Sequence, residues 1–326
     1  MNRLNRRAWL KLALTGSAAV ALEPVLALTA DLSDSGQNLW AVDGLSNFHA
    51  IYDDTAQRDA FLPFLRNVYH LYPEQEFHEL IRTSTLALPS DAAIYRAVQG
   101  QLGKIRPVLG DLRFGLPALR HQKQAMLEET LQLLGSNRTV NGYLEIGTTG
   151  RYLSVLRSAL DLQGERILLH SRKPAWSAED ILERGRLGMP GRFVDLRDYA
   201  AVSPTDIPDG GLDLITNFIG FHHAPAERLD GFVRSLHRVL RPGGRMVVRD
   251  HAVDSPIMNH RVALAHDVFN LGLNAPWTVN REEIRHFTSL DGLRTYLAAR
   301  GFRPEAGEIY QPGDPTRNAL MVFSKV

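Results

Sequence analysis

The sequence contains no cysteine, which excludes every site or scaffold that depends on a thiol. Disulfide frameworks, thiolate zinc sites, iron–sulfur clusters and cysteine nucleophiles are therefore ruled out. An excess of charge of one sign is also absent, because 37 Lys and Arg stand against 36 Asp and Glu, for a net charge of +1. This balance gives no reason to expect nucleic acid as a partner.

The sequence also lacks a hydrophobic run long enough to cross a membrane. The mostly apolar stretch near the N-terminus, Leu12 to Leu22, has about half of the roughly twenty residues that a stable membrane span needs. We therefore expect no stable transmembrane span. The composition, with 44% hydrophobic and 22% charged residues in a chain of 326, is that of a globular protein.

Residues 1–30 have the three parts of a signal peptide: a basic segment, a short apolar segment and a stretch of small residues. Within the basic part, Arg6 to Lys11 resembles the twin-arginine export signal, with paired arginines, an apolar pair and a lysine. The resemblance implies that the twin-arginine machinery exports a folded protein, to the periplasm or otherwise out of the cytoplasm. Cleavage is expected after Ala27 or Ala30. The alternative is an uncleaved tail on a cytoplasmic protein.

Residues 31–137 have the spacing of a helical region. Apolar residues at intervals of three and four predict an amphipathic helix over Leu116–Leu134, and similar but shorter patterns lie over Phe61–Leu71 and Phe77–Ile81. The segment from Asp111 to Pro117 has the composition of a loop. We expect an N-terminal helical region.

From residue 138 to 326, short β-rich runs alternate with amphipathic helices. The predicted strands are Tyr143–Ile146, Arg166–His170, Arg192–Asp195, Leu212–Thr216, Arg245–Arg249 and Ala319–Phe323. The predicted helices cover Tyr152–Leu160 and Leu229–Leu240, and two more begin after the capping residues Ser177 and Ser289. This alternation predicts a doubly wound α/β domain, with a mostly parallel sheet covered on both faces. Such sheets bind ligands at the carboxyl ends of their strands.

The turn after the first predicted strand, Leu144 to Arg151, is a candidate ligand loop. Gly147 lets the backbone approach a ligand without an intervening Cβ, and N–H groups at a helix start favour polar or anionic groups. Glu145 suits a cationic ligand. The middle glycine of a dinucleotide-binding loop is missing, so an ordinary strand–helix turn stays an alternative.

Two further motifs follow in order. Residues 207–225 carry an acid–glycine segment before a strand and the pair His222-His223 after it, and the run Arg238 to Gly244 leads into the next strand. In this order the motifs resemble class I S-adenosylmethionine-dependent methyltransferases that act on small molecules. The resemblance covers residues 138–326. It implies a Rossmann-like fold with seven strands, the last antiparallel, the cofactor S-adenosyl-L-methionine, and methyl transfer to an unidentified small-molecule acceptor.

The same resemblance implies roles for single residues. Glu145 resembles the acid that contacts the methionine ammonium, Asp195 the acid that bonds the adenine amine, and Asn217 and Phe218 the residues beside the methionine part. The cofactor-binding residues expected are Glu145, Gly147, Thr148, Gly150, Ser171, Asp195, Asn217 and Phe218.

One departure from the family pattern affects cofactor binding. The second strand of the family ends in an acid that holds the ribose hydroxyls, but this chain has His170-Ser171-Arg172 there. The loss of a charge-assisted hydrogen bond costs about 1.5–3 kcal/mol. Two main hypotheses follow: a methyltransferase, or an exported non-catalytic ligand-binding or scaffold protein with a degenerate methyltransferase fold. Export with the cofactor already trapped is an intermediate possibility.

A general base is needed only if the acceptor carries a proton that must leave. His222 is the candidate, since histidine titrates near neutral pH. Asp250-His251 offers further candidates, and a structural contact at a helix start is the alternative for the histidine pair.

Residues 252–288 are expected to form a helical insertion that caps the pocket. Within it His260 and His266 are six residues apart and so do not share a helix face. We expect a packed helix here and no metal site. Trp277 either stacks on a flat acceptor or belongs to the core.

Overall fold

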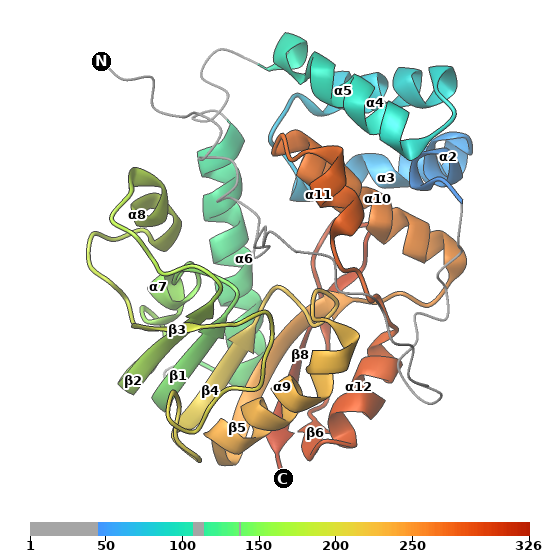
Figure 1. Ribbon diagram of the computed structural model, residues 1–326. Helices are drawn as coiled ribbons and strands as arrows, with labels where there is room; N and C mark the ends of the chain where they lie inside the picture. Colours follow the sequence, from blue (N-terminus) through green and yellow to red (C-terminus); the bar gives the residue numbers. More distant parts are fainter. Residues whose placement is uncertain (1–44, 107–113, 137) are drawn as a thin grey trace.

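The computed structural model describes residues 45–106, 114–136 and 138–326. The predicted export signal, residues 1–30, lies outside the described residues. A group of helices caps one end of a mixed sheet, and further helices cover the two faces of that sheet (Figure 1). No helix within the described ranges combines the length and hydropathy needed to cross a bilayer.

The cap is built mainly from short helices of the N-terminal region. They are α2 (Asn47–Tyr52), α3 (Thr55–Pro63), the π-helix η1 (Phe64–Val68), α4 (Glu74–Ala87) and α5 (Asp91–Ile105). The segment predicted as one helix over Phe61–Leu71 is helical as far as Val68, but it is divided between the end of α3 and the π-helix η1. The α-helix ends at Pro63 because proline lacks an N–H and crowds the preceding turn.

The insertion between β5 and the last strands completes the cap with α10 (Pro256–Gly272) and α11 (Trp277–Glu282). Buried residues of α10 share one hydrophobic cluster with buried residues of α2, α4 and α5. Two tyrosine hydroxyls also join the segment after η1 to α10. Tyr69 donates to the Phe269 carbonyl at 3.2 Å, and Tyr72 donates to the Gly272 carbonyl at 2.9 Å. The cap is thus one packed unit of two distant chain segments.

The sheet has the order β3-β2-β1-β4-β5-β8-β6, and the short β7 also pairs with β8. Its strands are β1 (Thr139–Ile146), β2 (Asp161–His170), β3 (Arg192–Asp195), β4 (Leu212–Asn217), β5 (Leu240–His251), β6 (Phe302–Pro304), β7 (Ile309–Tyr310) and β8 (Asn318–Lys325). Strands β1 to β5 run parallel and β8 is antiparallel to β5. The predicted mostly parallel, Rossmann-like sheet is confirmed, with seven strands along its main path and β7 in addition.

Side chains alternate between the two faces of the sheet, as the pleat requires. Met246 and Val248 of β5 face the cluster formed with α9 (Ala226–Val239) and α12 (Leu290–Ala298). Val247 faces the opposite cluster, formed with α6 (Leu116–Leu134) and α7 (Leu153–Leu156).

The predicted helix over Leu116–Leu134 is confirmed as α6. The two predicted capping serines are confirmed as well. Ser177 accepts a hydrogen bond from Asp180 N–H ahead of α8 (Ala178–Arg184), and Ser289 accepts one from Gly292 N–H ahead of α12.

Three local predictions need correction. Helix α7 ends at Leu156, because β2 starts as early as Asp161 to pair with Thr139. The strand predicted over Arg245–Arg249 begins earlier, at Leu240, and the Pro242 to Gly244 segment is an irregularity inside β5, where the register with β4 shifts. The predicted loop 111–117 lies partly outside the described residues, and its end belongs to α6, which starts at Leu116.

Candidate functional site

Four predicted segments meet at one edge of the sheet, where β1, β2, β3 and β4 end. Ile146 of β1 lies opposite Asn217 of β4, and His170 of β2 lies opposite Asp195 of β3. Because β1 pairs with both β2 and β4, these strand ends flank the turn after Ile146 on both sides. The sheet therefore brings together the segments that the sequence assigned to one ligand site.

Glu145 is fully buried, and its carboxylate is used inside the turn. It accepts hydrogen bonds from the hydroxyls of Thr148 and Tyr143 and from the backbone N–H groups of Tyr152 and Leu153. Burial raises the pKa of Glu145, while these hydrogen bonds act against the rise. Four donors occupy the roughly four acceptor positions of a carboxylate, so Glu145 stabilises the start of α7 and offers no position to a cationic ligand.

The two glycines of the turn allow tight packing of this chain on itself. Gly147 and Gly150 have φ of +82° and +101°, a region that favours glycine. A Cβ at position 147 would overlap the side chain of Ile219, and one at position 150 would overlap Pro190. The intervening Thr148 is 2% exposed. The backbone of the turn is therefore covered by side chains.

Helix α8 adds a buried ion pair to this cover. Arg151 and Glu183 lie 3.1 Å apart, with only 2% and 3% of their side chains exposed. The hydroxyl of Thr149 donates to the same Glu183 carboxylate at 2.9 Å. Burial alone would lower the pKa of Arg151, but the charge of Glu183 raises it. The pair thus fixes α8 over the turn.

The other predicted cofactor residues are divided between surface and core. Ser171 is half-buried, and the exposed Asp195 accepts a hydrogen bond from Arg197 N–H at 2.9 Å. Asn217 is fully buried, where its amide Nδ2 donates to the Gly220 carbonyl at 3.1 Å and its Oδ1 has no hydrogen-bond partner.

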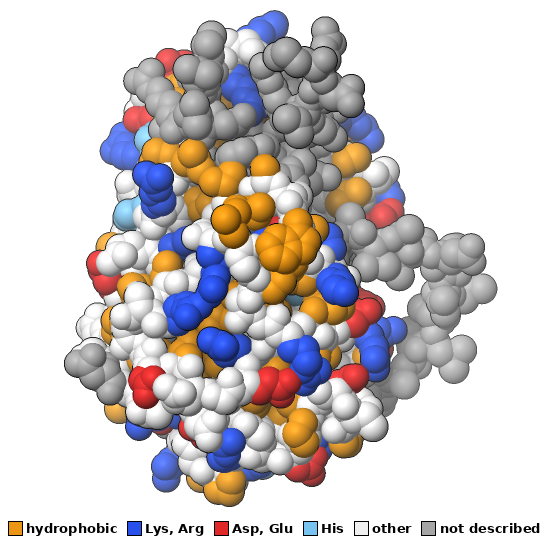
Figure 2. Space-filling view, turned by 90° about the vertical axis from the view of Figure 1, so that its left-hand side faces the viewer, with side chains coloured by type: hydrophobic (Ala, Val, Ile, Leu, Met, Phe, Trp, Pro, Cys, Tyr) orange, Lys and Arg blue, Asp and Glu red, His pale blue; other side chains and the backbone are white. Residues whose placement is uncertain are grey.

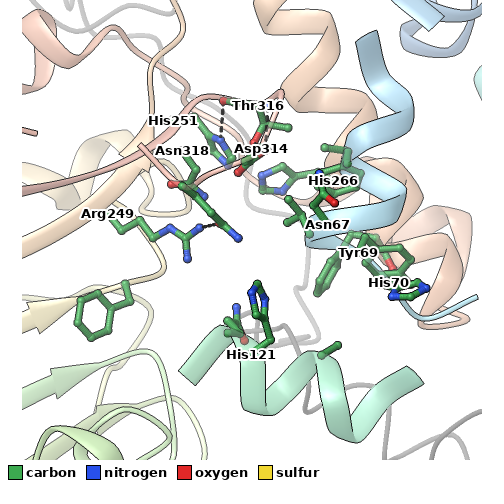
Figure 3. Close-up of a pocket in the computed structure, with 18 of the residues that line it drawn as sticks. Asn67, Tyr69, His70, His121, Arg249, His251, His266, Asp314, Thr316 and Asn318 are labelled. Atoms are coloured by element: carbon green, nitrogen blue, oxygen red, sulfur yellow. Dashed lines mark hydrogen bonds between the residues drawn. The ribbon is translucent and has the colours of Figure 1, made fainter. Parts of the chain in front are cut away.

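A cavity of about 680 Å³ lies between the edge of the sheet and the helical cap (Figure 3). This volume is within the usual range for small-molecule sites. Of the predicted cofactor-binding residues only Phe218 lines it, together with the candidate histidines His222, His223 and His251, and the turn 147–150 does not. Tyr152 packs edge-on against Phe218, with ring centres 4.6 Å apart. The aromatic residues of its wall are Phe64, Tyr69, Tyr152, Phe218 and Phe269.

Arg249 of β5 projects its guanidinium into this cavity (Figure 3) and is 5% exposed. It donates to Gln311 Oε1, contacts Met126 Sδ at 3.3 Å, and its Nε has no hydrogen-bond partner. No ion pair within 4.0 Å joins it to an acid of the described ranges; Glu129 and Asp314 act on it only from farther away. A buried cation without a paired carboxylate favours an anionic ligand.

Four histidines gather at another wall of the cavity: His222, His223, His251 and His266. His222 is the predicted base, and its Nδ1 donates to Asp250 at 2.6 Å. Burial would raise the pKa of Asp250, but its contacts with His222 and neighbouring donors hold it at about 2. Burial lowers the pKa of His223 to about 3 and that of His251 well below its usual value.

The sequence did not reveal this cluster. His222 follows β4, His251 ends β5 and His266 belongs to α10, so the three come from separate elements. The sequence did place His222 and His251 at the ends of two neighbouring strands, β4 and β5, and such ends meet at one edge of a sheet. The contribution of α10 needed the tertiary structure.

Two residues of the insertion, His260 and Trp277, lie outside the histidine cluster and the cavity wall. His260 Nδ1 bonds the Asn47 side chain at 3.0 Å, away from the other histidines. Trp277 packs edge-on against Tyr95, with ring centres 5.3 Å apart, and does not line the cavity. Of the two roles considered for Trp277, the core position is the observed one.

Seen from the α7 and α8 side, the surface has Lys and Arg side chains scattered among polar and hydrophobic ones, without one basic patch on this face (Figure 2). Exposed hydrophobic residues flank α8 here, with Trp176 66% and Leu187 72% exposed.

A family model described as a methyltransferase domain matches residues 118–306, more than half of the chain. The chain belongs to this methyltransferase-domain family. No curated protein matches it in sequence. The family match agrees with the resemblance seen in the motifs of residues 207–244.

Several solved structures are similar to this methyltransferase-domain chain. The 1,6-didemethyltoxoflavin-N1-methyltransferase of Burkholderia thailandensis, solved with 1,6-didemethyltoxoflavin and S-adenosylhomocysteine, is 16% identical over 73% of this chain and 92% of its own (TM-score 0.43). An O-methyltransferase family 2 protein of Planctomyces limnophilus with apigenin is 17% identical over 76% and 66% (TM-score 0.41). A possible exported protein of Bordetella parapertussis is 14% identical over 86% and 95% (TM-score 0.43). At these values the likenesses carry no conclusion about activity.

The cofactor implied for a methyltransferase domain, S-adenosyl-L-methionine, was expected along the turn 147–150. There Ile219 lies against Gly147, Pro190 lies against Gly150, and the acceptor positions of Glu145 are used. As the structure has them, these side chains pack against the turn, and the cavity begins next to it, at Arg151 and Tyr152. The structure therefore retains the fold of the family, with the turn 147–150 packed and not itself lining the cavity.

Proposed function

We propose that this methyltransferase-domain protein binds a small aromatic carboxylic acid in the cavity between the sheet and the cap. The observation that carries the proposal is the buried guanidinium of Arg249, which faces the cavity without a paired carboxylate among the described residues. A ligand carboxylate would supply the missing counter-ion and accept the unused Nε–H. The fold acts here as a binding scaffold, because fold alone does not determine function.

The rest of the cavity supports a flat, apolar ligand body. Aromatic rings of Tyr69, Phe218 and Phe269 provide the wall, and aromatic pairs gain about 0.5–1.5 kcal/mol beyond the burial of their area. Arg249 orients the acid end, and residues of the cap form the opposite wall. The binding step thus needs no group beyond the side chains of this chain.

The experiment compares an acid with its neutral counterpart. Calorimetry of the full chain with biphenyl-4-carboxylate and biphenyl-4-carboxamide should show at least about tenfold preference for the acid. Arg249→Met should remove the preference, and Arg66→Met, at an exposed arginine of the same cavity, should leave it. Equal binding of acid and amide by the unchanged chain would contradict the proposal.

S-adenosylmethionine-dependent methyl transfer to a small-molecule acceptor is the second candidate function. The match to the family over residues 118–306 favours it, and His222, held by Asp250, would be the base for an acceptor that loses a proton. It requires that the space beside the turn 147–150 admit the cofactor. Titration with S-adenosyl-L-methionine separates the two: micromolar affinity supports the methyltransferase, and no binding at millimolar concentration supports the scaffold.

Export through the twin-arginine machinery is part of the proposal. It rests on the paired arginines Arg6 and Arg7 and the apolar segment after them. Fractionation of cells that express the full chain should place the protein in the periplasm, and the double change of Arg6 and Arg7 to Lys should retain it in the cytoplasm. Retention of the unchanged chain in the cytoplasm would contradict export.

A further inference from the structure

We propose that His222, His251 and His266 bind one divalent transition-metal ion, with Zn²⁺ as the reference ion, at the wall of the cavity. One ring nitrogen from each of these histidines lies within 4.8 Å of the others. Imidazole nitrogen is a preferred ligand of Zn²⁺, and three protein ligands with one open position are typical of catalytic zinc sites.

The three rings have the separation that a tetrahedral site requires. Their centres lie 5.4 Å (His222–His251), 5.3 Å (His222–His266) and 5.7 Å (His251–His266) apart. Zn–N bonds of about 2.0–2.1 Å at tetrahedral angles place neighbouring ring centres about 5.2 Å apart. Small side-chain rotations are therefore enough to close the site on an ion.

Hydrogen bonds orient the rings as they do in known histidine sites. The carboxylate of Asp250 accepts from His222 Nδ1 at 2.6 Å, and the Thr316 carbonyl accepts from His251 Nδ1 at 3.2 Å (Figure 3). These partners place the proton on Nδ1 of both rings, which leaves the Nε2 lone pairs free for a metal ion. Carboxylate and carbonyl partners of this kind fix the tautomer of metal-bound histidines.

The surroundings fit a bound ion on both sides. Phe287 is 2% exposed and packs against all three rings, with ring centres 5.2 to 5.9 Å away, and so closes one side to water. On the other side the three histidines line the cavity. A fourth coordination position would therefore face the space where a small molecule enters.

A second triplet, His223, His266 and Glu283, shares one residue with the first. Its carboxylate is already engaged, since Glu283 accepts from Asn270 Nδ2 at 2.8 Å and from Arg285 Nη2 at 2.9 Å. These contacts leave Glu283 fewer positions for an ion. The geometry therefore favours the set of three histidines.

The test uses the full chain without a histidine tag, freed of metal with EDTA and dialysed. Calorimetry with Zn²⁺ should give one ion per chain, and Co²⁺ should give the strong visible absorption of a tetrahedral site. His251→Gln and His266→Gln should each weaken Zn²⁺ binding more than the roughly 10–100-fold that loss of an outer hydrogen-bond partner costs. His260→Gln, on the same helix as His266, is the matched control and should bind like the unchanged chain.

Two outcomes overturn the proposal: no stoichiometric ion, or a stoichiometric ion that the His251 and His266 variants bind equally well. If those variants fail to fold, imidazole ¹⁵N NMR of the unchanged chain decides, because Zn²⁺ must shift Nε2 of His222, His251 and His266. A shift confined to other histidines refutes the site. Arg249→Met should leave Zn²⁺ binding intact, so failure of the metal site is distinguishable from failure of the proposed acid binding.

Discussion

Ile219 packs directly against Gly147, so that the second residue after β4 lies beside the turn after β1. The contact joins two strand ends that are neighbours in the sheet. Together with the Arg151–Glu183 pair it packs the surroundings of the turn, and the cavity lies between the sheet edge and the cap.

Gly147→Ala should lower the free energy of unfolding by about 2–5 kcal/mol, because it combines a strained positive φ with an overlap on Ile219. Chemical denaturation measures the loss. Gly210→Ala is the control: its φ is also positive, at +59°, but a Cβ there meets nothing within 4 Å. If the contact matters, the double variant with Ile219→Ala should lose less than the sum of the single variants. Strict additivity would contradict the packing argument.

Glu183→Gln should destabilise the protein by about 3–5 kcal/mol, because it removes one charged partner from a buried ion pair. Thermal and urea unfolding report the change. Glu165→Gln removes a pair with Arg192 whose side chains are 45% and 43% exposed, and should change stability by no more than about 0.5 kcal/mol. Similar effects of the two substitutions would show that α8 is not held by this pair.

Asp250→Asn should reduce Zn²⁺ affinity by about 10–100-fold while one ion per chain still binds, because the amide holds His222 Nδ1 more weakly than the carboxylate does. Competition with a chromophoric chelator measures the affinity. Asp254→Asn, at a half-exposed acid paired with Arg317, should leave it unchanged. An unchanged affinity in the Asp250 variant would separate the hydrogen bond from metal binding.

His78 makes stability depend on pH in the mildly acidic range. Burial lowers the pKa of His78 below its ordinary 6.5. The positive charges of Arg58 and Arg82 lower this pKa further, and the negative charges of Asp59 and Glu79 oppose the shift without reversing it. The unfolded chain therefore takes up the proton first, and the stability contributed by neutral His78 falls as pH drops below 6.5.

The expected slope from this residue is at most about 1.4 kcal/mol per pH unit. Unfolding curves between pH 5 and 7 in the presence of EDTA measure it. His78→Gln should flatten the pH dependence by up to that amount, and a variant with the slope of the unchanged chain would show that His78 does not titrate on unfolding in this window.

The sequence by itself determined the order and type of most elements from residue 138 onward. Strands and helices were predictable there because pleat alternation, helical spacing and capping serines such as Ser177 and Ser289 are local signals. Their alternation also predicted that the segments ending at Ile146, His170 and Asn217 lie at one edge of the sheet. The motifs predicted the methyltransferase-domain family.

Only the tertiary structure decided what lies between those segments. That Ile219 fills the space at Gly147, that Glu183 of α8 reaches Arg151, and that His266 of α10 joins His222 and His251 are contacts between residues far apart in the chain. No local pattern encodes them, since they depend on how whole helices pack on the sheet. The length of α7 has the same origin, because the pairing of β2 with β1 from Asp161 onward limits the helix.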